Sequence, residues 1–275
     1  KNGIGAKAAN LFSNSFTVIT VFQKQKYIQV FTNQMRQKST PKITKTKEKD
    51  YTKIIFEPCL KAFSMQHLHE NDTITLIQKR TIDASAVTPK KVSVYYNKKK
   101  IPVKDFQDYM NLYIGNKSKT PRVYLDKFER WTIGFALNPY PSSVQVSFVN
   151  GIGTEEGGTH VNHILEPVLN RVVKELQEKH KNLSIRKQYI RDNIIVFVKA
   201  VIENPTFTSQ TKRCHTTQVN KFGSRVILTD DAIKKITKLG ITRGILEIAR
   251  AKELKDLNKT DGKKKIRLID IPKLD

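Results

Sequence analysis

Two short segments of the 275-residue sequence contain residues that could bind a phosphate group. The first is KNGIGAK at residues 1–7, where two glycines and an alanine precede the start of a predicted helix. Glycines in such a turn let backbone N–H groups approach phosphate oxygens, and the helix dipole favours negative charge there. The second is IENPTFTSQTK at residues 202–212, where a strand is expected to end at Glu203 and a polar loop follows. A lysine at such a loop tip can meet a terminal phosphate as a point charge.

Each of these segments has a second interpretation when it is taken alone. A glycine-rich turn before a helix occurs as often without a ligand as with one. The loop at residues 202–212 is, by itself, more typical of an ordinary solvated turn. The helices and strands around the two segments are therefore needed to choose between these interpretations.

The first part of the chain is predicted to consist mainly of strands, from the alternation of β-forming residues. In chain order we expect a helix start at 6–12 and a hairpin of strands 16–22 and 27–31 around a turn at 23–26. A Lys- and Thr-rich strand margin or exposed loop is expected at 39–50, followed by a strand at 51–56 closed by Pro58 and a helix at 71–82 capped by Asn71. A second hairpin of 92–96 and 101–103 around a turn at 97–100, and a helix at 103–114, complete this part.

A polar break at residues 116–120 predicts a domain boundary, which divides the chain into residues 1–119 and 120–275. Beyond it we expect strands at 122–125, 131–137 and 144–149, a long helix from Thr159 to about Lys179, a buried strand at 194–202, helices at 230–239 and 244–254, and a basic linker at 258–267. The order strand, helix, strand predicts a crossover connection between parallel strands.

Composition restricts the classes of protein that fit. Lys and Arg number 50 against 25 Asp and Glu, a formal net charge of +25, which favours a polyanionic partner. A solvated basic surface is the alternative. No apolar run approaches the roughly 18 residues that a membrane span needs, so no membrane partner is expected. Cys59 and Cys214 lack the spacing of a disulfide framework or zinc site, and His67 and His69 beside Glu70 favour a polar loop over a metal site.

Five ordered segments resemble the eukaryotic type of type IIA DNA topoisomerase. The opening residues are similar to the last seven positions of that family's GRNGxGAK, with Lys1 in place of Arg. SFVNGIGTEEGGTHV at 147–161 resembles its SFVNSIATxxGGTHV, and IENPTFTSQTK is close to its signature. FGSR at 222–225 and IPKLD at 271–275 follow in the expected order. The similarity covers the chain from end to end.

The resemblance implies an α+β fold, with the later part of a GHKL (Bergerat) ATPase domain at 1–119 and a βαβ-rich transducer domain at 120–275, ending before a TOPRIM domain. It places the catalytic Glu and the Mg²⁺-binding Asn upstream of Lys1 and the DNA-cleaving Tyr far downstream, so no catalytic residue or metal ligand is expected in this chain. Replacement of Arg by Lys at position 1 removes a planar, bidentate fork. The residues expected around the ATP phosphates are Lys1, Asn2, Gly3, Ile4, Gly5, Ala6 and Lys7, with Gln210, Thr211 and Lys212 from the transducer.

A basic stretch at residues 174–191 has two interpretations. In relatives, a lysine-rich loop at this place touches DNA, which assigns DNA binding to Lys179 and Lys181. The alternative is a solvated helix end, where the helix dipole favours cations. His160 is expected to have a structural role in the first turn of the long helix, with Thr159 as its cap.

The implied function is an ATP-gated clamp. Two protomers would bind ATP and Mg²⁺, form a homodimer and trap double-stranded DNA for passage through a second duplex, while this chain alone would hydrolyse no ATP. The alternatives are another GHKL protein, of gyrase or mismatch-repair type, or a non-enzymatic basic DNA-binding module. The Lys-, Ile- and Asn-rich composition and divergent motifs favour a large cytoplasmic DNA virus, with location in the host cytoplasm, over a protist nucleus.

Overall fold

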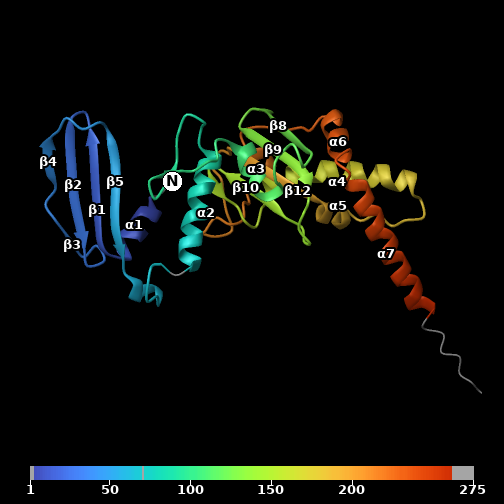
Figure 1. Ribbon diagram of the computed structural model, residues 1–275, viewed down its shortest axis with the longest axis horizontal. Coiled ribbons are helices and arrows are strands. Elements are labelled where there is room, and N and C mark those ends of the chain that lie inside the picture. Colours follow the sequence, from blue (N-terminus) through green and yellow to red (C-terminus); the bar gives the residue numbers. More distant parts are fainter. Residues whose placement is uncertain (1–2, 70, 262–275) are drawn as a thin grey trace, which may run out of the picture. The chain divides into compact units, whose positions relative to one another are not determined.

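A computed structural model describes residues 3–69 and 71–261 of the chain (Figure 1). It divides into two compact units, Lys1–Ile77 and Gln78–Asp275. The first unit contains a short α-helix, a 3-10 helix and a five-stranded sheet in the order β3-β2-β1-β5, with β4 also paired to β2. Its elements are α1 (Ile4–Leu11), β1 (Ser13–Phe22), β2 (Gln25–Thr32), β3 (Gln37–Lys38), β4 (Lys42–Lys45), β5 (Tyr51–Pro58) and the 3-10 helix η1 (Leu60–Phe63).

The hairpin expected at the start of the first unit is confirmed, with longer strands and a shorter turn. Strands β1 and β2 are antiparallel, and Phe22 pairs with Gln25. The turn consists of Gln23 and Lys24, whose φ angles are 48° and 61°. A two-residue hairpin turn of this kind needs positive φ at both positions, so Gln25 and Lys26, expected in the turn, join β2 instead.

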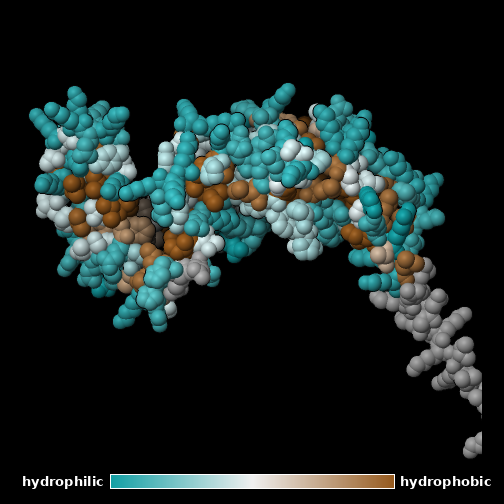
Figure 2. Space-filling view, viewed as in Figure 1, coloured by the Kyte–Doolittle hydropathy of each residue, from teal (hydrophilic) through white to brown (hydrophobic). Residues whose placement is uncertain are grey.

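Burial in the first unit is shallow. Among its described residues, Phe16 and Val21 on β1 are the buried apolar side chains. Ile54, Ile55 and Phe56 on β5 remain 46%, 47% and 53% exposed. Figure 2 shows hydrophobic residues gathered on the surface over the strands of this sheet. The sheet therefore lacks a thick core within the part of the unit that the structure describes.

The second unit is built on another five-stranded sheet, in the order β11-β10-β12-β9-β8. Strands β10 and β12 are parallel and the other pairs antiparallel, which confirms the expected crossover. Its elements are α2 (Asn71–Val87, beginning before the division between the units), β6 (Tyr95–Tyr96), β7 (Lys99–Lys100), α3 (Phe106–Ile114), β8 (Arg122–Phe128), β9 (Trp131–Leu137), β10 (Gln145–Val149), β11 (Ile152–Gly153), α4 (Thr159–Lys179), α5 (Lys187–Asn193), β12 (Ile194–Ala200), the 3-10 helix η2 (Val219–Lys221), α6 (Asp230–Thr237) and α7 (Ile241–Asp261).

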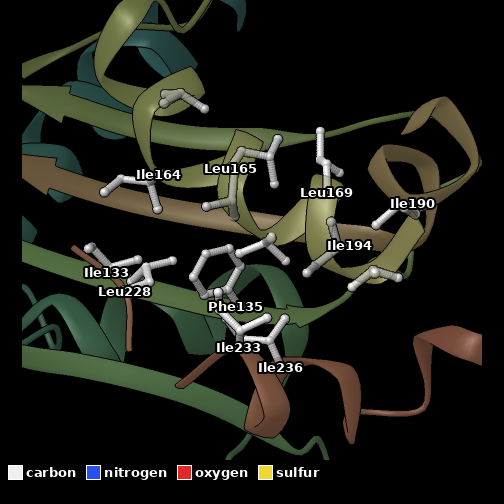
Figure 3. Close-up of a cluster of buried hydrophobic side chains, with 14 of the residues drawn as sticks. Ile133, Phe135, Ile164, Leu165, Leu169, Ile190, Ile194, Leu228, Ile233 and Ile236 are labelled. Carbon is white, nitrogen blue, oxygen red and sulfur yellow. The ribbon is translucent and has the colours of Figure 1, made fainter. Parts of the chain in front are cut away.

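Helices cover both faces of this second sheet. On one face α4, α5, α6 and α7 contribute to a large cluster that includes Phe135, Leu169 and Ile236, drawn in Figure 3. On the other face α3 packs through Phe106, Tyr109 and Met110. Strand β12 alternates between them, because Ile194, Val196 and Val198 belong to the first cluster while Ile195 and Phe197 belong to the second. This confirms the strand expected to be buried on both sides.

Some expected boundaries in the second unit were wrong. The second hairpin has strands of two residues each around Asn97 and Lys98, both with positive φ, so the arm expected at 101–103 is not its partner. Helix α3 begins after Asp105, whose carboxylate accepts a hydrogen bond from Asp108 N at 2.9 Å. Residues 258–261 continue helix α7 rather than starting a linker, and residues 262–267 lie outside the described part.

The compact units divide earlier than the domain boundary expected between residues 119 and 120. The reason is that Ala86, Val103 and the apolar face of α3 share a core with β9, β10 and β12. The assignment of residues 1–119 and 120–275 to two family domains stays a prediction. Among the described helices, none is both long and apolar enough to span a membrane.

Candidate functional site

The first candidate segment lies at the start of α1 in the first unit. Lys1 and Asn2 are outside the described residues. Gly3 is the helix N-cap with φ 63° and ψ 12°, a left-handed conformation that glycine adopts without steric cost. The helix begins at Ile4, so Ile4–Lys7 form its first turn and not the loop expected from the sequence.

The start of α1 is open within the described structure. No side chain caps it, and no heavy atom lies within 4 Å of a Cβ built at Gly3 or at Gly5. The first N–H groups of a helix have no acceptor inside the helix, so the amides of Ile4, Gly5 and Ala6 are available donors. The residues Gly3–Lys7 are all exposed. This arrangement fits a phosphate, which would receive backbone hydrogen bonds and meet the positive end of the helix dipole.

The second candidate segment is a small antiparallel hairpin in the second unit. Phe207 pairs with His215, and Thr208 N donates to Cys214 O at 3.1 Å. Strand β12 ends at Ala200, three residues before the expected end at Glu203. The tip therefore consists of residues 209–213, where Lys212 N donates to Ser209 O at 3.1 Å.

The side chains at this tip are at least partly open to solvent. Gln210 and Thr211 are exposed, and Lys212 is half-buried. Lys212 has a φ of 60°, which costs about 1–2 kcal/mol for a residue with a side chain. Its ammonium has no ion-pair partner among the described residues. A lysine with a strained backbone and an unpaired ammonium at a loop tip fits an anionic ligand.

The hairpin is attached to the glycine motif that precedes α4. His215 N donates to Gly157 O and Thr159 N donates to His215 O, both at 3.0 Å. Gly158 has a φ of 134°, and a Cβ built there would lie 2.1 Å from His215 O. Only a glycine permits this approach. The expected capping role of Thr159 was wrong, because Gly158 is the N-cap and Thr159 Oγ1 donates to Thr217 O at 2.7 Å.

Two buried histidines lie beneath this attachment. Thr159 Oγ1 gives its single proton to Thr217 O, so the 3.0 Å contact with His215 Nδ1 requires the histidine to donate. His160 Nε2 lies 3.2 Å from Thr154 Oγ1, and the two imidazole rings meet edge to face at 5.0 Å. Burial lowers the pKa of His160 to about 3 and the pKa of His215 to about 4. Both histidines are therefore neutral at neutral pH.

The FGSR segment at residues 222–225 contributes to the same anchor. The Phe222 ring packs against His215 at 5.7 Å, and Trp131 Nε1 donates to Ser224 Oγ at 2.8 Å. Gly223 has a φ of 75° and lies against the Glu203 side chain. The IPKLD segment lies outside the described residues.

The residues expected to contact DNA lie at the end of α4. Lys179 is the last residue of the helix, Lys181 follows His180, and both lysines are exposed. Neither has an ion-pair partner among the described residues, whereas Glu166 pairs with Lys187 at 2.7 Å and with Arg191 at 2.5 Å. Their charges are available to phosphates, and contact with DNA stays a prediction.

No metal site is formed by the described residues, where no group of three or more His, Cys, Asp or Glu side chains could hold an ion. His67 and His69 stack at 5.0 Å on an exposed segment, and Glu70 lies outside the described residues. Cys59 and Cys214 are free thiols in different units.

The two phosphate-binding candidates lie in different compact units, and their joint contact with one ligand stays a prediction. Sequence reasoning missed a set of ion pairs beside the second candidate, in which Glu155 meets both Arg213 and Arg80. The sequence feature that could have indicated these ion pairs is the position of two charged residues beside motifs. Glu155 lies shortly before the glycines at 157 and 158, and Arg213 directly follows Lys212.

Comparisons with known proteins find similar sequences and a similar solved structure. A family model described as DNA gyrase B matches residues 90–265. DNA topoisomerase 2 of Arabidopsis thaliana is 41% identical over 284 residues, which cover 100% of this chain and 19% of that protein. DNA topoisomerase 2 of Acanthamoeba polyphaga mimivirus is 40% identical over 268 residues, covering 96% of this chain and 21% of the relative.

The crystal structure of the ATPase region of Saccharomyces cerevisiae topoisomerase II matches with a TM-score of 0.82 at 36% identity, covering 90% of this chain and 65% of that one. This match confirms the expected fold class. The chain spans about a fifth of the length of the curated relatives above, from 19% to 21%. The chain belongs to the DNA gyrase B family, and within that family it is of the eukaryotic topoisomerase II type.

Proposed function

We propose that this chain is the ATP-gate region of a full-length type II DNA topoisomerase, an enzyme that uses ATP to pass one DNA duplex through a transient break in another. The observation that carries the proposal is the tip at residues 209–213. It presents Gln210 and Lys212 on a hairpin held by backbone hydrogen bonds to the glycine motif before α4. A cation in that position can bind a terminal phosphate and release it on hydrolysis.

ATP would be bound by both candidate segments. The open N-terminus of α1, from Gly3 to Lys7, would receive phosphate oxygens through backbone N–H groups, and Lys1 and Asn2 would extend that contact. Gln210, Thr211 and Lys212 would meet the γ-phosphate, with the amide and hydroxyl groups donating hydrogen bonds and Lys212 supplying charge. Mg²⁺, the general base and the DNA-cleaving residue would belong to parts of the enzyme outside this chain.

The bound nucleotide would act by selecting a closed state. A ligand shifts a conformational equilibrium by its difference in affinity for the two states, and a contact made by Lys212 only in the closed state supplies such a difference. Closure would join two protomers around double-stranded DNA. The net charge of +25, and Lys179 and Lys181 at the end of α4, would attract its phosphates.

The cellular location follows from the source of the gene. Relatives include a mimivirus protein as well as eukaryotic ones. With the Lys-, Ile- and Asn-rich composition, this supports replication sites of a large DNA virus in the host cytoplasm, with a nucleus as the alternative.

The test is Lys212→Ala in the full-length enzyme. Removal of one charge-assisted hydrogen bond of about 1.5–3 kcal/mol should raise the ATP concentration for half-maximal closure and strand passage roughly ten- to hundredfold. DNA binding without nucleotide should be unchanged, because the tip would contact the nucleotide and not DNA. Lys221→Ala, an exposed lysine in η2 of the same unit, is the matched control. Relaxation of supercoiled DNA by Lys212→Ala at the wild-type ATP dependence would contradict the proposal.

A further inference from the structure

Arg213, which directly follows Lys212, begins a series of ion pairs that ends on helix α2. Its guanidinium Nε lies 3.4 Å from Glu155 Oε2. Arg80 Nη2, on α2, donates to the other carboxylate oxygen, Glu155 Oε1, at 2.6 Å. One carboxylate therefore lies between two guanidinium groups that are far apart in the sequence.

The α2 end of this series is attached to the core of the second unit. Arg80 Nη1 also lies 3.7 Å from Asp83 Oδ2. Asp83 is 4% exposed, and it accepts hydrogen bonds at 2.6 Å from Lys79 Nζ and from the Tyr109 hydroxyl. A buried carboxylate with two hydrogen-bond donors and a nearby guanidinium is costly to displace. The Arg80 guanidinium thus contacts two carboxylates, those of Asp83 and Glu155.

The Glu155 backbone is also held in place. Gln145 Nε2 donates to the carbonyl oxygens of Thr154 and Glu155, at 3.0 and 2.8 Å. The next residue, Glu156, donates its N–H to Arg213 O at 3.0 Å. Gly153 leaves space for the Arg80 guanidinium, since a Cβ built there would lie 3.1 Å from Arg80 Nη1. The carboxylate therefore sits at a defined position between loop and helix.

The strengths of the two contacts differ. The Arg80–Glu155 contact is a hydrogen bond of 2.6 Å, whereas the Arg213–Glu155 contact is a looser ion pair of 3.4 Å. Movement of the tip that carries Lys212 would first change the looser pair. Such a change reaches the other guanidinium through the shared carboxylate, because withdrawal of one cation removes its repulsion of the second and so favours the remaining pair.

We propose that Glu155 is a positioning residue that couples the Gln210–Lys212 tip to helix α2. Helix α2 begins at Asn71, in the first compact unit, and its residues from Gln78 onward belong to the second. The inference rests on the proposed function, in which that tip binds the γ-phosphate. Because coupling between two sites is reciprocal, a broken link weakens the response of α2 to nucleotide and the response of the tip to α2.

The first experiment compares Glu155→Gln with Glu156→Gln in the full-length enzyme. Glu156 also pairs with Arg213, at 3.4 Å, so both variants remove one carboxylate from Arg213, but only Glu155 contacts Arg80. The probe is the β,γ-imido analogue of ATP, which cannot be hydrolysed. Glu155→Gln should raise the analogue concentration for half-maximal closure about two- to fivefold, the effect of one partly exposed ion-pair link. Glu156→Gln should stay at the wild-type value.

A local readout separates coupling from a simple decrease in stability. In the wild type, the analogue should slow amide hydrogen exchange at residues 78–83 of α2. In Glu155→Gln this nucleotide-dependent slowing should disappear, while exchange without nucleotide and thermal unfolding stay as in Glu156→Gln. Glu155→Asp, which keeps the charge, should restore part of the slowing.

A double-mutant cycle supplies the second test. Arg80→Gln and Arg213→Gln should be non-additive in their effect on closure, because both act through Glu155. In combination with Glu155→Gln, their effects should become additive.

Two failures are distinguishable. A Glu155→Gln enzyme that matches Glu156→Gln in closure and exchange, beside a Lys212→Ala enzyme that closes poorly, would overturn the positioning role alone. Wild-type closure of Lys212→Ala would overturn the proposed function. Additive effects of Arg80→Gln and Arg213→Gln in the presence of Glu155 would also overturn the link.

Discussion

The two glycine-containing segments, one in each compact unit, use glycine for opposite purposes. Around Gly3 and Gly5 the described structure is open, with nothing within 4 Å of a built Cβ. Around Gly158 there is no room, because His215 backbone atoms lie 2.1–2.8 Å from a built Cβ. The first glycines leave space for a ligand to approach the backbone, and the second lets the protein pack against itself.

The elements that support the two segments also differ in how deeply they are buried. The first unit supports α1 on a sheet whose strand β5 is largely exposed. The second unit supports the Lys212 tip on buried histidines and on a sheet covered by helices on both faces. The tip is therefore positioned by packing within its own unit, whereas the described start of α1 is exposed.

The sharpest test of this difference is a matched pair of glycine substitutions. Gly158→Ala places a Cβ inside the His215 backbone and forces a positive φ on alanine, which should destabilise the second unit by about 1–3 kcal/mol. Urea unfolding followed by the fluorescence of Trp131, the single tryptophan, measures this unit. Gly5→Ala meets no atom within 4 Å, and should slow amide exchange in α1 by stabilising the helix by about 0.5–1 kcal/mol. Equal destabilisation by both would contradict the comparison.

The buried histidines predict a pH dependence for the second unit. Burial lowers the pKa of His215 to about 4 and that of His160 to about 3, from an ordinary value of 6.5. As pH falls below 6.5, the unfolded chain binds protons that the folded chain does not. The stability that these neutral histidines provide is thus complete above pH 6.5 and is lost as pH falls toward 4 and 3.

The expected slope is about 1.4 kcal/mol per pH unit for each histidine between pH 6 and 5, measured by urea unfolding of Trp131. His215→Gln should remove the contribution of His215, which is roughly half of the combined slope from the two histidines. His67→Gln, at an exposed position in the first unit, is the control and should leave the slope unchanged. A slope unaffected by His215→Gln would show that His215 does not remain neutral in the fold.

The smallest expected effect concerns the basic residues of the two units. Lys179→Glu with Lys181→Glu should lower the slope of log binding constant against log salt for duplex DNA by about 0.9 for each phosphate that is no longer neutralised. Lys42→Glu with Lys45→Glu makes the same charge change on the exposed strand β4 of the first unit. An equal decrease of slope in both double variants would show that net charge, and not the end of α4, determines DNA binding.

Much of the secondary structure could be predicted because local patterns decided it. Helix α4 ends at Lys179 as expected, since its apolar residues recur at helical spacing. Strand β12 was recognisable as buried from its run of apolar residues. The predicted ends of strands were wrong where backbone geometry, and not the periodicity of apolar residues, determined them. The turns at Gln23–Lys24 and Asn97–Lys98 take positive φ without the glycine or asparagine–glycine pair that would have predicted them.

The sequence by itself determined the two phosphate-binding candidates and their order, because residue type and spacing along a local loop carry that information. It also determined the basic charge. Only the tertiary structure decided that His215 packs into Gly158, that Thr159 bonds to Thr217 instead of capping α4, and that Glu155 lies between Arg80 and Arg213. Thr159 and Thr217 are 58 positions apart in the chain, and Arg80 and Glu155 are 75 positions apart. Such pairings depend on how helices and strands pack, which no local pattern records.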